Sequence, residues 1–337
     1  MLYWPPKDAT NAPVLTDRHG RSFPYLRLSV TDVCNFKCSY CLPDGYKPTG
    51  KSPFLSRDEL VRTAKAFVGM GTWKIRLTGG EPTVRRDFFE IAEEIAGIDG
   101  LETLALTTNG YKLPERAQRL RDCGINAINI SIDSMSREGF RAVTGRDRFG
   151  DVIGGIEAAI AAGFDSIKLN AVLLKGINDR EIGELIGFVQ DKPVDMRFIE
   201  LMETGLSADY FAKRHLSADV VRDFLAEGGW SPVPRAVGAG PAERFSHPES
   251  QGEVGIIAPY SKDFCKGCNR LRVSARGDLH LCLFGKTGFP LRDLLEDDAQ
   301  RPQLQARLTK LLALKTESHF LHDGDTGMTP NLAYLGG

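Results

Sequence analysis

The sequence predicts an α/β fold, an incomplete (β/α)6 TIM-type barrel with a C-terminal α+β region covering the open side. Two observations lead to this prediction. Six segments that resemble strands alternate with five that resemble helices between residues 25 and 200, which is typical of parallel βα units. Their spacing is roughly even, and six strands are fewer than the eight of a complete barrel.

The strands carry a second periodic signal in addition to their number. Ile128 and Ile130 share one face of a strand, while Asn129 and Ser131 share the other. The apolar faces suit a shell of helices, so the polar faces are expected to line the lumen, where they need a polar occupant. A flat antiparallel sheet with one wet face is the alternative, but the intervening helices favour parallel strands. The predicted strands are 25–31, 74–78, 103–108, 126–133, 166–173 and 194–200, and the predicted helices are 56–70, 86–97, 113–123, 150–162 and 179–190.

The chain divides into three predicted parts: an N-terminal lead-in over 1–24, the barrel over 25–200, and a C-terminal region over 201–337. The lead-in is rich in Pro, Asp and Arg and is expected to be loose. Beyond residue 201 the βα rhythm stops. The predicted elements there are a helix at 217–227, a loop at 231–252, strands at 254–259 and 270–283, and helices at 290–297 and 301–316.

Charge and hydropathy exclude several classes of protein. Lys and Arg total 43 and Asp and Glu total 44, which disfavours a general nucleic-acid binder. No apolar run approaches the ~18 residues of a membrane span. The first 13 residues contain three prolines and no apolar segment of the signal-peptide type. We therefore expect a cytoplasmic protein that binds neither nucleic acid nor membrane.

Three cysteines, Cys34, Cys38 and Cys41, follow the first predicted strand with the spacing C-x3-C-x2-C. A barrel places its active-site loops at this end of its strands. Three thiolates can hold a [4Fe–4S] cluster and leave one iron open to a small chelating ligand. A structural zinc ion is the alternative, but it needs four ligands, and no fourth is obvious nearby.

A second set of cysteines, Cys265, Cys268 and Cys282, has the spacing C-x2-C-x13-C. Three thiols again fit a cluster with an open iron. Zinc has more weight as an alternative here, because His280 lies close to Cys282 in the sequence. The seventh cysteine, Cys123, stands alone and is interpreted as a small buried residue.

Cations on the predicted strands outnumber the acids that are expected to point inward. A buried cation costs several kcal/mol unless it is paired, and the visible inward acids, Asp133 and Glu200, are too few to neutralise these cations. A polyanion such as a triphosphate would balance them, since an Arg fork grips phosphate oxygens. Alternatively, each is a salt-bridged structural cation. The cations concerned are Arg27, Arg76, Lys168, Arg197, Arg270 and Arg272.

Several motifs together resemble known enzymes. The first cysteine set, with Tyr40 before its last cysteine, and the run Gly79-Gly80-Glu81-Pro82 resemble the radical S-adenosylmethionine superfamily. The stretch from Phe264 to Arg272 resembles the molybdenum cofactor biosynthesis protein A family, the GTP 3′,8-cyclases. This resemblance covers most of residues 25–284 and the final Gly336-Gly337.

The resemblance implies two [4Fe–4S] clusters, S-adenosylmethionine as cofactor, GTP as substrate, and a lyase reaction that yields 3′,8-cyclo-7,8-dihydro-GTP. It implies that Cys34, Cys38 and Cys41 are catalytic and that the Gly336-Gly337 tail enters the active site. The implied contacts to S-adenosylmethionine are Tyr40, Gly80, Glu81, Ser131 and Met202. The implied contacts to GTP are Arg27, Arg76, Thr107, Lys168, Arg197, Arg270, Leu271 and Arg272.

The same resemblance implies a homodimer, an electron donor, and a downstream cyclic pyranopterin monophosphate synthase. Two alternatives differ in class. One is another radical enzyme with an auxiliary cluster, such as a peptide maturase, which would have an acidic or apolar groove rather than convergent cations. The other is a zinc-binding interaction module without catalysis.

Overall fold

The computed structural model describes residues 14–48, 53–204, 208–235, 239–285, 287–327 and 332–335. Within these ranges the strands form a single twelve-stranded sheet. Six of the strands run parallel and confirm the predicted barrel segment. They are β1 (Tyr25–Thr31), β2 (Lys74–Gly79), β3 (Thr103–Thr108), β4 (Ala127–Ser131), β5 (Ser166–Leu173) and β6 (Asp195–Glu200).

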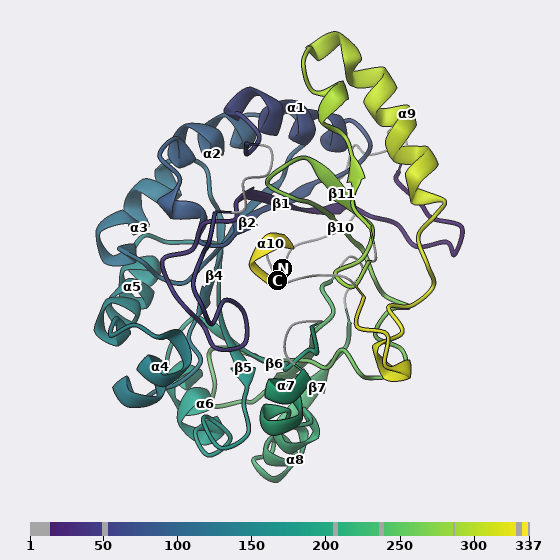
Figure 1. Cartoon of the computed structure of the whole chain (residues 1–337). Helices are drawn as coiled ribbons and strands as arrows, with labels where there is room; N and C mark the ends of the chain where they lie inside the picture. Colours follow the sequence, from purple (N-terminus) through teal and green to yellow (C-terminus); the bar gives the residue numbers. More distant parts are fainter. Residues whose placement is uncertain are drawn as a thin grey trace.

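The helices between these strands form an outer layer around the sheet (Figure 1). Leu26, Leu28 and Ile128 are fully buried between the two layers, as the apolar faces of the strands require. The five predicted helices are present as α1 (Arg57–Val68), α2 (Phe88–Ala96), α3 (Leu113–Asp122), α5 (Phe149–Ala161) and α6 (Ile182–Gln190).

A further helix, α4 (Arg137–Thr144), precedes α5 and was not predicted. The Ser136 hydroxyl accepts a hydrogen bond from the Gly139 amide at 3.0 Å and caps the start of this helix. Gly145 ends it in a left-handed conformation, with φ of +64°. Eight residues are too few to show a clear helical repeat of apolar side chains, so Ser136 and Gly145 indicate this helix better than its hydrophobic pattern does.

The predicted open side of the barrel is narrowed from both edges by strands of the C-terminal region. β10 (Arg270–Val273) pairs in parallel with β1, and β9 (Val254–Ile257) pairs in parallel with β6. The two strands therefore extend the parallel sheet at its two edges. In the described part of the chain β9 does not pair with β10, so the sheet does not close into a complete barrel.

Other predictions for the C-terminal region need correction. The predicted loop at 231–252 contains an antiparallel pair, β7 (Ser231–Val233) and β8 (Glu243–Ser246), which continues the sheet beyond β9. The predicted strand at 270–283 is a hairpin of β10 and β11 (Asp278–His280), turned at Gly277, whose φ is +90°. Strand β12 (Phe289–Pro290) completes the order β12-β11-β10-β1-β2-β3-β4-β5-β6-β9-β8-β7.

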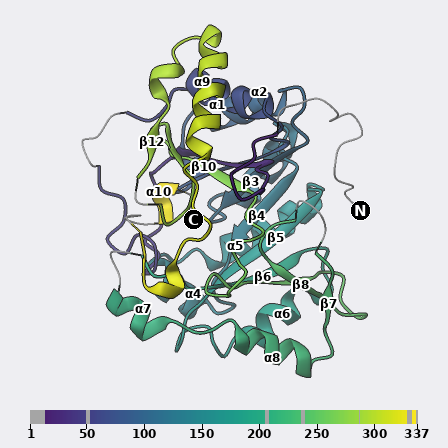
Figure 2. The same cartoon turned by 90° about the vertical axis from the view of Figure 1, so that its right-hand side faces the viewer.

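The predicted helix at 290–297 is a 3-10 turn at Arg292–Leu294, and a second such turn follows at Asp298–Gln300. Helix α9 (Arg301–Leu312) ends four residues before the predicted 316. Further 3-10 turns lie at Pro82–Val84 and Leu321–Asp323. The remaining helices are α7 (Ala208–Arg214), α8 (Asp219–Glu227), as predicted, and α10 (Leu332–Leu335) (Figure 2).

Residues 14–24 are not the loose lead-in that composition indicated. Leu15 and Phe23 are buried, and Thr16 bridges to Ser22. Arg21 pairs with the buried Asp17 at 2.7 Å. The proposed division of the chain at residues 24 and 200 stays a prediction.

Helix α10 lies at the centre of the barrel (Figure 1) and touches β1 and β2. Leu332 and Leu335 pack there with Tyr40 and Met202. The chain therefore returns to the lumen near its end. The Gly336-Gly337 tail lies outside the described residues. None of the helices in the described ranges has the length and apolar character that a membrane span requires.

Candidate active site

The first cysteine set lies on the loop that follows β1. The Lys37 and Ser39 amides donate to the carbonyls of Thr144 and Val143 at 3.0 and 2.9 Å, which ties this loop to the end of α4. The Cys41 amide donates to the Cys38 carbonyl at 2.9 Å and turns the chain between them. All three cysteines are partly buried and free of disulfides. The prediction that one loop presents three thiols is confirmed.

Burial disfavours the charged form of the thiols in this loop. Burial raises the pKa of the Cys34 thiol to about 11. Burial and the neighbouring Cys34 raise that of Cys41 to about 12, although the Leu332 and Ala333 amides donate to its sulfur and oppose the rise. Thiolates at these positions need a strong positive charge, which iron supplies. Amide hydrogen bonds to the sulfurs also suit an iron–sulfur cluster.

The Gly79-Gly80-Glu81-Pro82 run lies directly against the start of the cysteine loop. The Gly80 amide donates to the Thr31 carbonyl at 2.9 Å, and a Cβ on Gly80 would lie 2.3 Å from the Val33 carbonyl oxygen. Only glycine allows this approach. The glycines therefore fix the distance between the β1 and β2 loops.

The Glu81 side chain joins the loops after β2 and β3. It is fully buried, and its carboxylate accepts hydrogen bonds from the Thr83 amide and hydroxyl, the Thr108 hydroxyl and the Asn109 amide at 2.6 to 3.2 Å. These donors occupy most of its acceptor capacity. The contact of Glu81 with S-adenosylmethionine stays a prediction.

Tyr40 and Met202 lie together beside the first cysteine set, in the apolar cluster that also contains Cys41. The Tyr40 hydroxyl donates to the Asp133 carboxylate at 3.1 Å. Burial raises the pKa of Asp133 to about 6. Ser131, at the end of β4, is half-buried. The sequence identifies Asp133 only as an acid that points into the lumen. Its contact with Tyr40 joins residues far apart in the chain and becomes apparent only in the folded structure.

The second cysteine set joins the loop before β10 to the end of β11. The Cys268 amide donates to the Cys265 carbonyl at 3.1 Å, and Cys282 lies two residues beyond β11. Burial would raise the pKa of Cys268, but the charges of Lys315 and Arg270 outweigh it and lower the value to about 7. This thiol is therefore close to the ionised form that a metal requires.

A mononuclear zinc site receives no support from this geometry. In the described part of the chain, no three His, Cys, Asp or Glu side chains converge where one metal ion would be held. His280 is buried, and its ring packs edge-on against Tyr334, with 5.6 Å between centroids. A four-iron cluster is bound through several irons, so its cysteines need not converge on one point. The donor set of three thiols fits such a cluster.

Five cations and one tyrosine from three adjacent strands meet on the lumen face in two rows. In each row the residues lie directly opposite one another across β10, β1 and β2. Because side chains alternate along a strand, all six point to one face. The first row is Arg270, Tyr25 and Lys74, and the second row is Arg272, Arg27 and Arg76.

These rows create a strong positive field. Burial lowers the pKa of Arg27 to about 9, and the charges of Arg272 and Arg76 contribute to this. Burial likewise lowers that of Lys74 to about 8. The Tyr25 hydroxyl accepts from Arg76 at 2.6 Å, and the charges of Arg76 and Arg27 outweigh burial and lower its pKa to about 6. The direction of this shift reflects the cations that surround the phenol.

The remaining predicted contacts lie on β3, β5 and β6. Thr107 accepts a hydrogen bond from Arg76 at 3.3 Å. Lys168 pairs with Asp195, so the structural alternative holds for that cation. Arg197 lies opposite Asn170 of β5, and burial lowers its pKa to about 10.

The contact of Leu271 with GTP stays a prediction, and the main chain would have to make it. Leu271 lies between Arg270 and Arg272 on β10, so its side chain points to the face of the sheet opposite the lumen. There it is buried in the hydrophobic core, with 2% of its surface exposed. Lys74 and Tyr25 were missed. Lys74 lies two residues before Arg76, and Tyr25 lies two residues before Arg27. The alternation of side chains along a strand would therefore have placed both on the lumen face.

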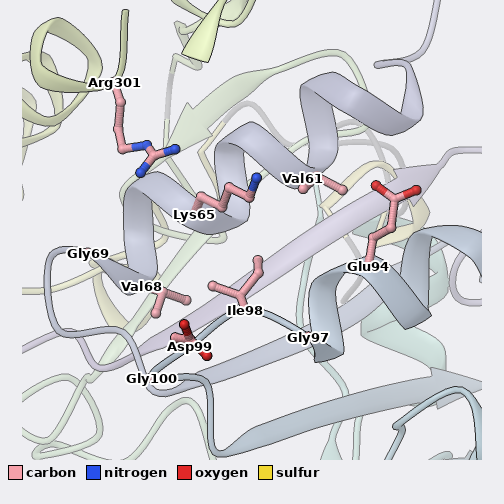
Figure 3. A pocket seen from close by; sticks show the side chains of 10 residues that line it. All are labelled: Val61, Lys65, Val68, Gly69, Glu94, Gly97, Ile98, Asp99, Gly100 and Arg301. Carbon is pink, nitrogen blue, oxygen red and sulfur yellow. The ribbon is translucent and has the colours of Figure 1, made fainter. Parts of the chain in front are cut away.

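A separate pocket of about 600 Å³ lies outside the barrel, between α1, the end of α2 and the start of α9. Figure 3 shows Lys65 and Arg301 together with Glu94 and Asp99 around it. This pocket contains no cysteine, whereas the lumen brings the two rows of mainly basic side chains together with both cysteine sets. We therefore place the active site in the lumen.

Comparisons with known proteins identify the family of the chain. The Radical SAM superfamily profile matches residues 28–189, and the Molybdenum Cofactor Synthesis C profile matches 194–321. Among solved structures, Streptococcus suis SuiB bound to precursor peptide SuiA aligns with a TM-score of 0.60 at 15% identity. That alignment covers 86% of this chain and 68% of SuiB and shows a shared fold.

Two curated relatives share most of the sequence. The GTP 3′,8-cyclase of Stenotrophomonas maltophilia (strain R551-3) is 54% identical over 96% of this chain and 99% of its own length. The GTP 3′,8-cyclase of Yersinia pestis is 52% identical over the same shares of both chains. The chain therefore belongs to the GTP 3′,8-cyclase family of the radical SAM superfamily.

Proposed function

We propose that this protein is a GTP 3′,8-cyclase that converts GTP to 3′,8-cyclo-7,8-dihydro-GTP in molybdenum cofactor biosynthesis. The observation that carries the proposal is the pair of rows of mainly basic side chains in the lumen. One set of three cysteines lies on the loop after β1, and the other lies on the loop before β10 and beyond the end of β11. Relatives with this name that match nearly the full chain support it.

Cys34, Cys38 and Cys41 would hold the first [4Fe–4S] cluster. When bound, it supplies the electron that cleaves S-adenosylmethionine into methionine and a 5′-deoxyadenosyl radical. Gly80, Ser131 and Met202 surround this end of the lumen. Tyr40, fixed by Asp133, would pack against the bound cofactor and exclude water from it.

GTP would bind along the two rows. Arg27, Arg76, Arg272 and Lys74 offer guanidinium and ammonium groups to a triphosphate, and a phosphate can accept several of their bonds at once. Fixing the triphosphate and the base at opposite ends holds the ribose at one place, which selective removal of its 3′ hydrogen requires. The ribose carbon radical would then bond to carbon 8 of guanine, and the resulting guanine radical would take up one electron, from the separate electron donor, and one proton to give the 7,8-dihydro product.

Cys265, Cys268 and Cys282 would hold a second [4Fe–4S] cluster. Three cysteines leave one of its irons short of a ligand. We propose that a guanine atom completes that coordination, with Arg270 beside it. Electron–nuclear double resonance with nitrogen-labelled GTP tests this, and a bound label with no coupling to the second cluster would refute it.

The chain end is part of the proposed site. Helix α10 lies between Cys41 and Cys282 in a single apolar cluster, and the Tyr334 hydroxyl donates to Asp278 at 3.2 Å. A tail of two glycines after it has no side chains to obstruct a narrow lumen. Deleting Gly336 and Gly337 should leave cluster content intact and impair cyclisation. Full cyclisation by the shortened chain would contradict this role.

The wider setting is proposed from the same family. The enzyme would act as a cytoplasmic homodimer, receive its electron from a separate donor, and pass its product to a cyclic pyranopterin monophosphate synthase. Anaerobic reconstitution followed by incubation with GTP, S-adenosylmethionine and reductant tests the activity. The expected product is the cyclised nucleotide, together with 5′-deoxyadenosine. Cleavage of the cofactor without a change in GTP would overturn the substrate assignment.

A further inference from the structure

Lys315 is a buried cation beside the second cysteine set. Its residue is 3% exposed, and its ammonium donates to the carbonyl of Leu281, which directly precedes Cys282. The same ammonium lies 5.2 Å from the centroid of the Phe23 ring. Within the described residues, it forms no ion pair with a carboxylate.

The chain around Lys315 is fixed in place. The Arg21 guanidinium donates to the carbonyls of Thr316 and Glu317 at 2.6 and 2.7 Å, and also to the carbonyl of Cys265 at 3.1 Å. One side chain therefore joins the segment that carries Lys315 to the cysteine loop. Moving the ammonium out to solvent would require this segment to shift and these bonds to break.

An ammonium buried without a counter-charge is costly, by several kcal/mol. A hydrogen bond to one carbonyl and contact with an aromatic face recover only part of that cost. The carbonyl that the Lys315 ammonium contacts belongs to Leu281, the residue directly before Cys282. The anions that best complete the balance are thus the cysteine thiolates themselves.

We propose that Lys315 is a positioning residue for the second iron–sulfur cluster: its fixed charge stabilises the thiolate-bound cluster and raises the cluster's reduction potential. The inference rests on the proposed function, which assigns a cluster to these cysteines. Arg270 and Arg272 differ from Lys315, since they face the lumen and are available to substrate. Lys315 is held by a main-chain carbonyl, so its charge is present whether or not GTP is bound.

The test uses the full chain with Cys34, Cys38 and Cys41 changed to Ala, so that spectroscopic signals come from the second cluster alone. Lys315→Met removes the charge and keeps a similar shape. Lys310→Met is the matched control, because Lys310 is exposed on the same segment of chain. The measurements are the midpoint potential by electron paramagnetic resonance, the rate of iron loss to a chelator, and the thermal midpoint of the iron-free chain.

Lys315→Met should make one-electron reduction about tenfold less favourable, a shift of about 59 mV to lower potential. Iron should also be lost several-fold faster. The iron-free chain should unfold at the same or a higher temperature, because the variant removes an uncompensated buried charge. This opposite effect on the iron-free and iron-bound forms separates a charge role from simple packing. Lys310→Met should change none of these values.

An unchanged potential and an unchanged rate of iron loss in Lys315→Met would overturn the proposal. So would a lower thermal midpoint of the iron-free chain in both Lys315→Met and Lys315→Arg, which would indicate packing alone. If the parent chain binds no iron through Cys265, Cys268 and Cys282, the cluster assignment in the proposed function fails instead. That outcome is read from the parent and is distinct from any effect of Lys315.

Discussion

The two cysteine sets contain the same number of thiols but lie in opposite electrostatic surroundings. Around the first set, burial and the neighbouring Asp133 raise the pKa of Cys38 well above its usual range. Around the second set, the charges of Lys315 and Arg270 lower the pKa of Cys268 to about 7. The acid beside Cys38 suits the sulfonium cation of the cofactor that we propose there, and the cations beside Cys268 suit the anionic nucleotide that we propose on the other side of the lumen. The difference teaches that two sets with the same number of thiols can lie in different electrostatic surroundings, and we propose different ligands for them.

The largest expected effect comes from removing a cysteine of either set. Cys34→Ser should abolish formation of 5′-deoxyadenosine, since the electron for cleavage enters there. Cys282→Ser should retain cleavage and lose GTP binding. Product chromatography and equilibrium dialysis with GTP separate the two losses. The comparison breaks if Cys34→Ser still cleaves S-adenosylmethionine, or if Cys282→Ser binds GTP as the parent does.

Gly80→Ala tests the first site without touching a cysteine. Its Cβ would lie 2.3 Å from the Val33 carbonyl oxygen, so the β1 and β2 loops would have to separate. We expect binding of S-adenosylmethionine to weaken at least roughly tenfold, with little change in GTP binding. Gly187→Ala in α6 is the control, because a Cβ at that position would meet no described atom within 4 Å. Equal calorimetric affinities for the parent and Gly80→Ala would contradict the tight approach.

Arg272→Met tests the second half of the comparison. Charge-assisted hydrogen bonds contribute about 1.5–3 kcal/mol each, so GTP affinity should fall about 10- to 100-fold. The iron content and the cleavage of S-adenosylmethionine without substrate should stay as in the parent. Arg301→Met, at the exposed start of α9, should leave GTP affinity unchanged. A variant that loses iron along with GTP would place Arg272 in the cluster site instead.

The smallest effect is spectroscopic and concerns Tyr25. The surrounding cations lower its pKa to about 6 in the folded chain, against a usual value near 10. Between these values the folded state holds fewer protons than the unfolded state, so Tyr25 contributes stability that is lost as pH falls through about 6. The iron-free protein should show tyrosinate absorbance at pH 8, and Tyr25→Phe should remove it.

Adding GTP should reverse this signal in the parent. A bound triphosphate neutralises the cations and lets the pKa of Tyr25 return toward its usual value. A tyrosinate band that persists with GTP bound would place the triphosphate away from the two rows.

The sequence predicted the part of the fold that depends on local period and spacing. The alternation of apolar and polar residues in segments such as 127–131 was enough to predict the six parallel strands. The spacing between cysteines was enough to group them into two sets. The pairing of β10 with β1 could not be predicted, because it joins residues about 245 positions apart. That pairing is what brings Arg272 opposite Arg27.

Some features of the site depend on local packing that the sequence does not show. The side chain of Leu271 lies in the core because of its position on the strand. The Thr108 and Asn109 donors to Glu81 come from the loop after the next strand. Lys315 fell inside a predicted helix, and the true end of α9 at Leu312 is what allows its ammonium to turn inward.

The strands that pair with the two edges of the barrel segment, β9 and β10, come late in the chain. During synthesis, a chain that has reached residue 250 therefore carries β1 and β6 with unpaired edges, and such edges readily pair with other chains. Closure waits for about the last quarter of translation, which also delivers the second cysteine set and Lys315. The fold therefore separates the two cysteine sets in time: the loop that carries the first set emerges early, and the second set is in place only when synthesis is almost complete.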